Sequence, residues 1–217
     1  MTNHLISNII EMKLKLAIKY RNENHFMLKK EIIWREILYQ ALEKKHNNFT
    51  QKELAQKFGF SLSTVFNALK IPRASGAIEV SGRFFRVTDK YKFLNIWATH
   101  HNLTKDIIYK THVDLPVQKI EGQLPSTAFP ACYSAYRLKF NEAPADYDKV
   151  YVYTDNLEEI QKRFPPKKGN ANLIVLQADD FLKNYQPFPP LAQIYTDLWN
   201  LGEWHAEDFL KGLKSKF

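Results

Sequence analysis

The chain has 217 residues, of which 45% are hydrophobic and 14% aromatic, so it can bury a substantial core in one large or two small domains. Its single cysteine, Cys132, excludes an internal disulfide and a multi-cysteine zinc site. No apolar run approaches the roughly 18 residues that a membrane-spanning helix needs, and the N-terminus does not resemble a secretory signal. We therefore expect a cytoplasmic protein without a membrane partner.

The positive charge of the chain is concentrated in its N-terminal part. The net charge is +8, and residues 1–90 hold 16 Lys and Arg against 8 Asp and Glu, whereas residues 91–217 hold 15 of each kind. Such an excess attracts polyanions through counterion release and gives affinity for a phosphate backbone. A basic surface that only keeps the protein soluble is the alternative, and a DNA-binding motif in the same residues would argue against it.

Two amphipathic segments come first along the chain. Residues 5–20 carry a broad apolar stripe that includes Leu5, Ile9 and Leu16, which predicts a helix. The stripe can be covered by the C-terminal half or by a second chain, and both alternatives stay open. Residues 30–45 form a second amphipathic pattern, which predicts the supporting helix of a three-helix unit.

Residues 50–70 have the pattern of a helix-turn-helix. Ala55 is the small residue expected where the two helices cross, Gly59 permits the positive φ of a helix C-cap, and Ser61 can cap the second helix. Inward positions are predicted for Leu54, Phe58, Leu62, Val65 and Leu69. A helical hairpin buried in a core is the alternative. The agreement of small residue, glycine, cap and apolar pattern favours the DNA-binding motif.

A β-hairpin is predicted directly after this motif. Pro72 is expected to end the second helix, and apolar residues then alternate between 78 and 87 around the Ser81–Gly82 pair. A hairpin in this place is the wing of a winged helix. The residues predicted to contact DNA bases or phosphates are Gln51, Lys52, Ser61, Ser63, Thr64, Asn67, Lys70, Arg73, Arg83 and Arg86.

Helices and strands alternate in the second half of the chain. Helices are predicted over residues 91–101, 127–139 and 156–163, strands over 149–154 and 172–177, and two helices separated by Gly202 at the end. The sequence thus predicts an α+β protein with a winged helix-turn-helix followed by an α/β domain with a smaller sheet. The predicted divisions are an N-terminal helical extension at 1–30, the DNA-binding domain at 31–90 and the α/β domain at 91–217.

The second half shows few signs of catalysis. It has no glycine-rich phosphate-binding loop, no Gly-Ser pair and no histidine cluster with metal-ligand spacing. Asp179 and Asp180 follow an apolar strand, where they can serve a metal or cap a helix over the next residues. We expect a protein that is not an enzyme and that needs no cofactor or metal. The alternative is a nucleic-acid-directed enzyme whose site lies at these aspartates.

One run near the C-terminus is more specific than the other patterns. It is Pro-x-x-Gln-x-Tyr-x-Asp-Leu, present as Pro190, Gln193, Tyr195, Asp197 and Leu198 and followed by Leu201–Gly202. Together with the predicted winged helix and the segment 124–131, this run resembles the AbiEi-type antitoxins, transcriptional regulators of type IV toxin-antitoxin systems. The similarity spans most of residues 31–217, and the extension of about thirty residues before it departs from the family pattern.

The resemblance implies a repressor that binds the operator of its own operon. The winged helix would bind double-stranded DNA, and a homodimer on an inverted repeat is the usual arrangement of so small a DNA-binding module. The C-terminal domain would neutralise a nucleotidyltransferase-like toxin without forming a direct complex with it. A C-terminal domain that binds a partner protein is a further alternative.

Overall fold

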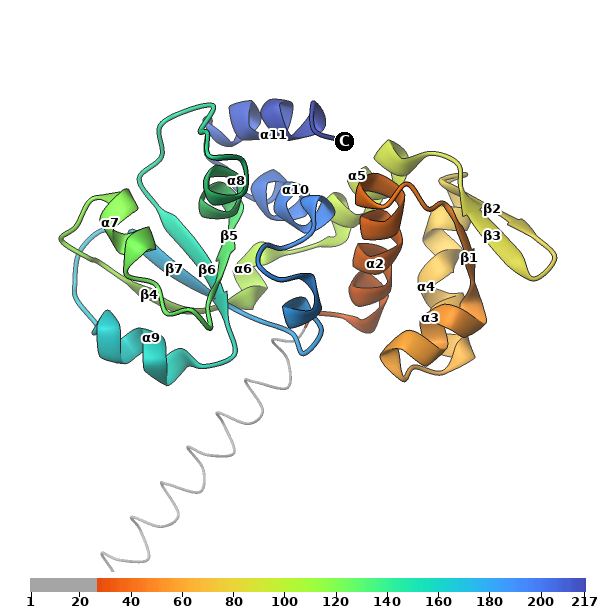
Figure 1. Cartoon of the computed structure of the whole chain (residues 1–217), viewed down its shortest axis with the longest axis horizontal. Coiled ribbons are helices and arrows are strands. Elements are labelled where there is room, and N and C mark those ends of the chain that lie inside the picture. The colour runs from red at the N-terminus through yellow and green to blue at the C-terminus, as the bar shows by residue number, and fades with distance from the viewer. Residues whose placement is uncertain (1–26) are drawn as a thin grey trace, which may run out of the picture.

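The computed structural model describes residues 27–217, which form helices and two small sheets in a mixed α+β arrangement (Figure 1). The predicted helix over residues 5–20 lies outside the described residues. The first elements are α2 (Lys29–Glu43), β1 (Asn48–Thr50), α3 (Gln51–Phe58), α4 (Leu62–Ala74), β2 (Ile78–Ser81), β3 (Phe84–Val87) and α5 (Lys90–His100). Then follow α6 (Leu103–Asp106), β4 (Ile107–Thr111), α7 (Val117–Gly122), β5 (Phe129–Ala131), α8 (Cys132–Phe140), β6 (Val150–Thr154), α9 (Leu157–Arg163), β7 (Leu173–Gln177), the 3-10 helix η1 (Leu182–Tyr185), α10 (Leu191–Trp199) and α11 (Ala206–Lys214).

Three helices and an antiparallel sheet of order β1-β3-β2 form the first part of the fold. Phe49 of β1 lies opposite Phe85 of β3, and their rings stack with centroids 5.4 Å apart. The β2–β3 turn consists of Gly82 and Arg83, one residue later than the predicted pair, because Ser81 already pairs with Phe84. Gly82 has φ +59°, a conformation that a tight hairpin turn requires.

The ends of α3 and α4 follow from their local sequence. Thr50 and Glu53 form a capping box at the start of α3, and Gly59 ends this helix with φ +65°. Ser61 accepts a hydrogen bond from the backbone N–H of Thr64 and so caps α4. The predicted roles of the glycine and the serine are therefore confirmed.

Pro72 does not end α4, contrary to the sequence-based prediction. The helix continues to Ala74 with the proline inside it. A proline leaves the carbonyl four residues earlier without its helical partner, which here is the carbonyl of Ala68. The buried indole Nε1 of Trp34 on α2 donates to this oxygen at 2.7 Å. The tertiary contact replaces the missing backbone bond, and the helix gains another turn.

The second sheet has the order β4-β7-β6-β5, with β6 and β7 parallel and the outer pairs antiparallel. Both faces of its central strands are buried, as alternate residues show. Val150, Val152 and Val175 belong to an apolar cluster that includes Ile120 of α7 and Ile160 of α9. The alternate residues of β6 and β7 belong to a larger cluster with residues of α8, α10 and α11, which lie together in Figure 1. The sheet therefore lies between two layers of helices.

The predicted helix over residues 127–139 is wrong in its first part. Phe129–Ala131 form strand β5, which pairs with β6, and α8 begins only at Cys132. The strand lies at the edge of its sheet, where Pro130 can be tolerated without a ladder N–H donor. The small residues Ala131 and Ala135 are buried as expected.

The larger apolar cluster runs through both halves of the described chain, from Ile32 to Leu213. Helix α10 packs on α2 and α5 as well as on α8 and α11. The two predicted domains thus share a buried interface, and the boundary near residue 90 stays a prediction. Across residues 27–217, none of the helices combines the length and apolar character needed to cross a bilayer.

Candidate nucleic-acid interface

Helix α4 presents most of its predicted contact residues to solvent. Its inward face consists of Val65, Ala68, Leu69 and Pro72, all buried. Ser63, Asn67, Lys70 and Arg73 are exposed, and Thr64 is partly exposed. At 1.5 Å per residue, these side chains extend over about 15 Å of the helix. One face of α4 therefore offers hydroxyl, amide and cationic groups to a partner.

Three hydroxyl groups gather at the N-terminus of α4. The Oγ of Ser61 lies 2.9 Å from the Oγ of Ser63 and 2.9 Å from the Oγ1 of Thr64. The hydroxyl of Ser61 also caps α4, so its hydrogen bonds are already used within the helix N-terminus. Ser63 and Thr64 are therefore better placed than Ser61 to meet a partner.

A shallow groove of about 370 Å³ joins three separate elements. Gln51 and Lys52 come from the start of α3, Leu62 from the start of α4 and Arg83 from the β2–β3 turn. Thr50 and Gly82 complete its lining. Residues more than 30 positions apart in sequence thus meet at one surface. Two cationic side chains flank a groove that also receives the partly positive N-termini of two helices.

Arg86 lies on a different side of the hairpin from this groove. The strand alternates, so Phe85 and Val87 are buried while Phe84 and Arg86 face solvent. Arg86 donates to Glu79 at 3.4 Å, and both side chains are more than 60% exposed. An exposed ion pair of this kind contributes little to stability. The structure therefore brings Arg83, but not Arg86, together with the start of α3.

The predicted inward position of Leu62 is wrong. Leu62 is 56% exposed because it lies at the edge of the groove, beside Gly82 and Arg83, and not under another helix. Phe66, one turn later, is 47% exposed and was not predicted as a surface residue. Its position directly after the inward Val65 is the periodic signal that could have identified it. The Nζ of Lys70 lies 5.5 Å from the centre of the Phe66 ring.

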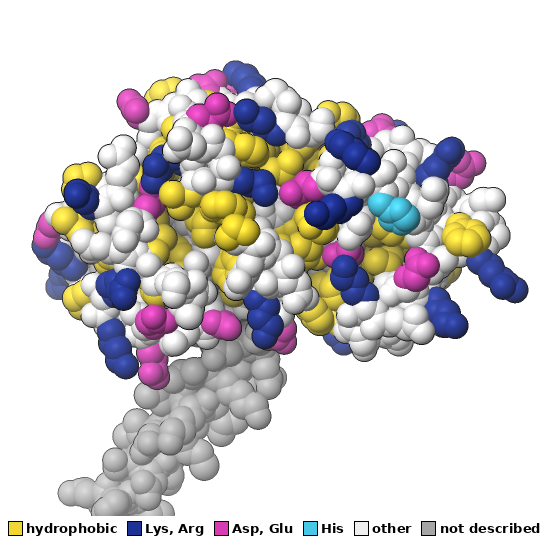
Figure 2. Space-filling model, viewed as in Figure 1, with side chains coloured by type: hydrophobic (Ala, Val, Ile, Leu, Met, Phe, Trp, Pro, Cys, Tyr) yellow, Lys and Arg dark blue, Asp and Glu magenta, His cyan; other side chains and the backbone are white. Residues whose placement is uncertain are grey.

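The surface around these elements is rich in cations. Figure 2 shows Lys and Arg side chains across the end of the molecule that carries α3, α4 and the hairpin, with fewer Asp and Glu side chains between them. This distribution agrees with the charge excess of residues 1–90. The positive electrostatic potential at this end of the molecule favours an anionic partner.

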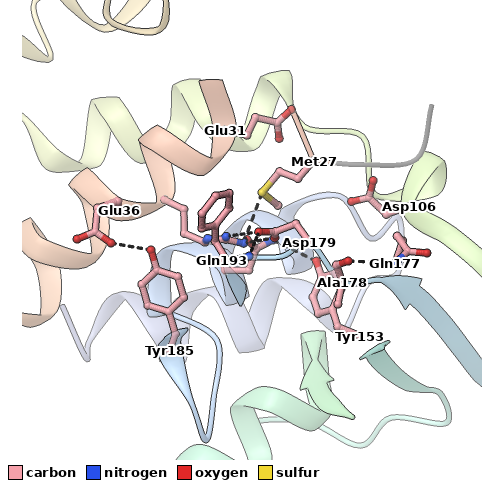
Figure 3. A network of polar contacts seen from close by, with 12 residues as sticks. Met27, Glu31, Glu36, Asp106, Tyr153, Gln177, Ala178, Asp179, Tyr185 and Gln193 are labelled. Carbon is pink, nitrogen blue, oxygen red and sulfur yellow. Dashed lines mark hydrogen bonds and ion pairs between the residues drawn. The ribbon is translucent and has the colours of Figure 1, made fainter. Parts of the chain in front are cut away.

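A buried ion pair fixes α2, the helix on which α4 packs. Arg35 is fully buried and donates from two nitrogens to Asp179, at 2.6 and 2.7 Å (Figure 3). Burial opposes the charged guanidinium, but the Asp179 carboxylate outweighs it and raises the pKa of Arg35. Asp179 also accepts the backbone N–H of Phe181. The carboxylate thus ties α2 to the segment after β7.

The neighbouring residue of α2 makes a second set of links. Glu36 accepts hydrogen bonds from the Tyr185 hydroxyl at 2.6 Å and from the Lys57 Nζ at 2.6 Å. Tyr185 belongs to η1 and Lys57 to α3. Consecutive residues of α2 therefore connect α2 and α3 to the C-terminal half.

A third polar cluster surrounds His101 at the end of α5. Its Nδ1 lies 2.7 Å from Glu31 Oε2, and its Nε2 lies 3.4 Å from Asp106 and 4.0 Å from Asp197. Burial raises the pKa of Asp106 to about 7 and that of Asp197 to about 6. Burial lowers the pKa of His101, but the Glu31 carboxylate outweighs it, so the pKa is raised overall. Of the two carboxyl groups, Asp106 has the pKa that lies nearest neutral pH.

The C-terminal run from Pro190 to Leu198 belongs to the same buried network. Gln193 donates to Tyr153 and to Asp197, and Tyr153 also donates to Asp197 at 3.0 Å. Tyr195 donates to Asn95 of α5 at 2.9 Å. The polar residues of the run therefore hold α10 between the sheet and α5.

The structure places Asp179 in the ion pair with Arg35 and leaves Asp180 exposed. No group of three or more His, Cys, Asp or Glu within residues 27–217 has the arrangement of a metal site. Comparison of the chain with protein-family models, curated proteins and solved structures gave no match.

Proposed function

We propose that the protein is a sequence-specific regulator that binds double-stranded DNA through a winged helix. The observation that carries the proposal is the single groove that joins the starts of α3 and α4 to the β2–β3 turn. The order α2-β1-α3-α4-β2-β3 and the sheet order β1-β3-β2 support this proposal, because a hairpin follows directly after the pair of helices α3 and α4. The charge of this end of the molecule supports a polyanionic partner.

In this proposal α4 enters the major groove, which is about 12 Å wide and admits one helix. Ser63, Thr64 and Asn67 contact base edges, since their side chains donate and accept hydrogen bonds. Lys52 and Arg83 neutralise phosphates on either side of the groove in the protein surface.

We further propose that the regulator is an autorepressing antitoxin of the AbiEi type, which the resemblance of residues 31–217 supports. It would act on its own operator, as a homodimer on an inverted repeat, and its C-terminal half would counter a nucleotidyltransferase-like toxin. Repression of a reporter placed behind the promoter region of its own operon tests the first part. The second part is tested by expressing the neighbouring gene of the operon alone and together with this protein. Growth that is arrested in the first case and restored in the second supports the antitoxin role.

Fluorescence anisotropy with a duplex from that promoter region and a random duplex of equal length tests DNA binding directly. We expect tighter binding to the promoter duplex. Arg83→Ala should weaken binding to both duplexes about equally, whereas Asn67→Ala should mainly reduce the preference between them. Lys110→Ala is the control, because this exposed lysine lies on β4 of the other sheet.

Two results would refute the proposal. One is the absence of binding to any duplex at low salt, where phosphate contacts are strongest. The other is equal weakening by Lys110→Ala and Arg83→Ala, because binding would then follow net charge and not the winged-helix surface.

A further inference from the structure

The outward face of α4 contains an apolar pair among its polar groups. Leu62 and Phe66 lie one helical turn apart and are 56% and 47% exposed. Ser63 and Asn67 occupy the neighbouring positions on the same face. An exposed pair of large apolar side chains in a proposed contact surface indicates a partner that offers apolar groups as well as charges.

Neither side chain belongs to the buried face of α4. The core positions of α4 are filled by Val65, Ala68, Leu69 and Pro72. Phe66 has Lys70 over its ring at 5.5 Å, so a cation lies directly beside the apolar surface. Leu62 lines the same groove as Lys52 and Arg83, so cations lie near this side chain as well. This combination of cations and apolar groups favours nucleic acid over an apolar protein surface.

The major groove displays one apolar group, the C5-methyl of thymine, and Phe is among the residues that contact it. Asparagine pairs with the N6 and N7 of adenine on the same groove edge. We propose that α4 selects A·T pairs, with thymine methyl groups packed on Phe66 and Leu62 and an adenine bound by Asn67. The inference rests on the proposed DNA binding and adds the base composition of the site.

The geometry limits how far apart the contacted thymines lie. Four residues of a helix span about 6 Å, and adjacent base pairs are about 3.4 Å apart. Leu62 and Phe66 should therefore contact thymines one or two base steps from each other. A bound site should contain two such thymines within about three base pairs.

The test compares thymine with uracil, which lacks only the methyl group. Duplexes of 30 base pairs with a random centre are first selected for binding to the full chain. Dissociation constants are then measured for the selected duplex and for copies with dU in place of dT at single positions. We expect about fourfold weaker binding for each contacted methyl, the value of one buried methyl or methylene group. For Phe66→Ala the difference between dT and dU should fall below twofold.

Phe84→Ala is the matched control. Phe84 is also exposed, at 59%, but it lies on the outer face of the small sheet with Arg86. This variant should retain the full preference for dT. Circular dichroism of both variants should show unchanged melting, because each removes a side chain from the surface.

Three results overturn the inference in distinguishable ways. Equal affinity of the wild type for dT and dU duplexes, or a preference that survives Phe66→Ala, refutes the methyl contact and leaves DNA binding intact. Selected sites without neighbouring thymines refute the A·T preference. If no duplex is selected, the proposed function fails as well.

Discussion

Removing the carboxylate of Asp179 should strongly destabilise the protein. Its partner Arg35 is fully buried, and the side chain of Asp179 is itself only 5% exposed. In Asp179→Ala the guanidinium keeps its charge in the interior but loses two hydrogen bonds of 2.6 and 2.7 Å. Gln193 Oε1, at 3.5 Å from Arg35, is a poor replacement. Breaking a buried pair in this way costs about 3–5 kcal/mol, a large part of a typical unfolding free energy of about 5–15 kcal/mol.

Urea denaturation followed by tryptophan fluorescence measures this loss. We expect a lower midpoint with an unchanged slope, since the surface exposed on unfolding stays the same. Glu79→Ala is the matched control, because it breaks the exposed pair with Arg86 and should cost less than about 1 kcal/mol. The double variant Arg35→Met/Asp179→Leu should recover much of the loss, because it removes both buried charges.

A loss for Asp179→Ala no larger than that for Glu79→Ala would show that the buried charge pair does not stabilise the fold. A double variant as unstable as the single one would show that the loss comes from packing and not from an unpaired charge. A changed slope would instead indicate that the variant no longer unfolds in one step.

Three further predictions concern local stability. Trp34→Phe leaves the Ala68 carbonyl without a donor and should cost about 1–3 kcal/mol, measured by urea denaturation; an unchanged midpoint would contradict the role given to the indole. Gly59→Ala places a Cβ on a backbone with φ +65° and should cost about 1 kcal/mol, although no atom lies within 4 Å of that Cβ. Gly76→Ala, at φ +73°, is the comparison outside the α3–α4 turn. A loss near zero for Gly59→Ala would refute the backbone strain. The free energy of unfolding should fall between pH 5 and pH 8 by on the order of 1–3 kcal/mol, because folded Asp106 keeps a proton up to about pH 7 that the unfolded chain releases near pH 4. The raised pKa of His101 acts in the same direction. Asp106→Asn should therefore reduce the dependence of the unfolding free energy on pH without removing it. A steeper dependence in this variant would contradict the role given to Asp106.

Patterns within a few residues predicted the two short helices α3 and α4 and the hairpin that follows them. Gly59, Ser61 and the alternating residues of β2 and β3 act on their own backbone, so their effect can be inferred from neighbouring sequence. The exposed set at Ser63, Asn67 and Lys70 follows from the same periodicity.

Features that depend on distant residues were not predictable. Arg35 and Asp179 are separated by 144 positions, and no local pattern marks either as a partner of the other. The continuation of α4 through Pro72 depends on Trp34, a residue of another helix. The exposure of Leu62 depends on the hairpin turn beside it and not on the helical period. Short strands such as β5 are equally dependent on their sheet, because Phe129–Ala131 is too brief to carry a pattern.

The indole of Trp34 also determines how far α4 reaches. Without its hydrogen bond, the proline would favour an end to the helix before Pro72. With it, the helix runs for 13 residues, about 20 Å, and Arg73 lies in its final turn. A fully buried side chain on α2 therefore sets the length of the exposed face of α4, although it contributes no atom to that face. We expect changes at position 34 to shorten α4 while leaving every exposed residue of the proposed interface in the sequence.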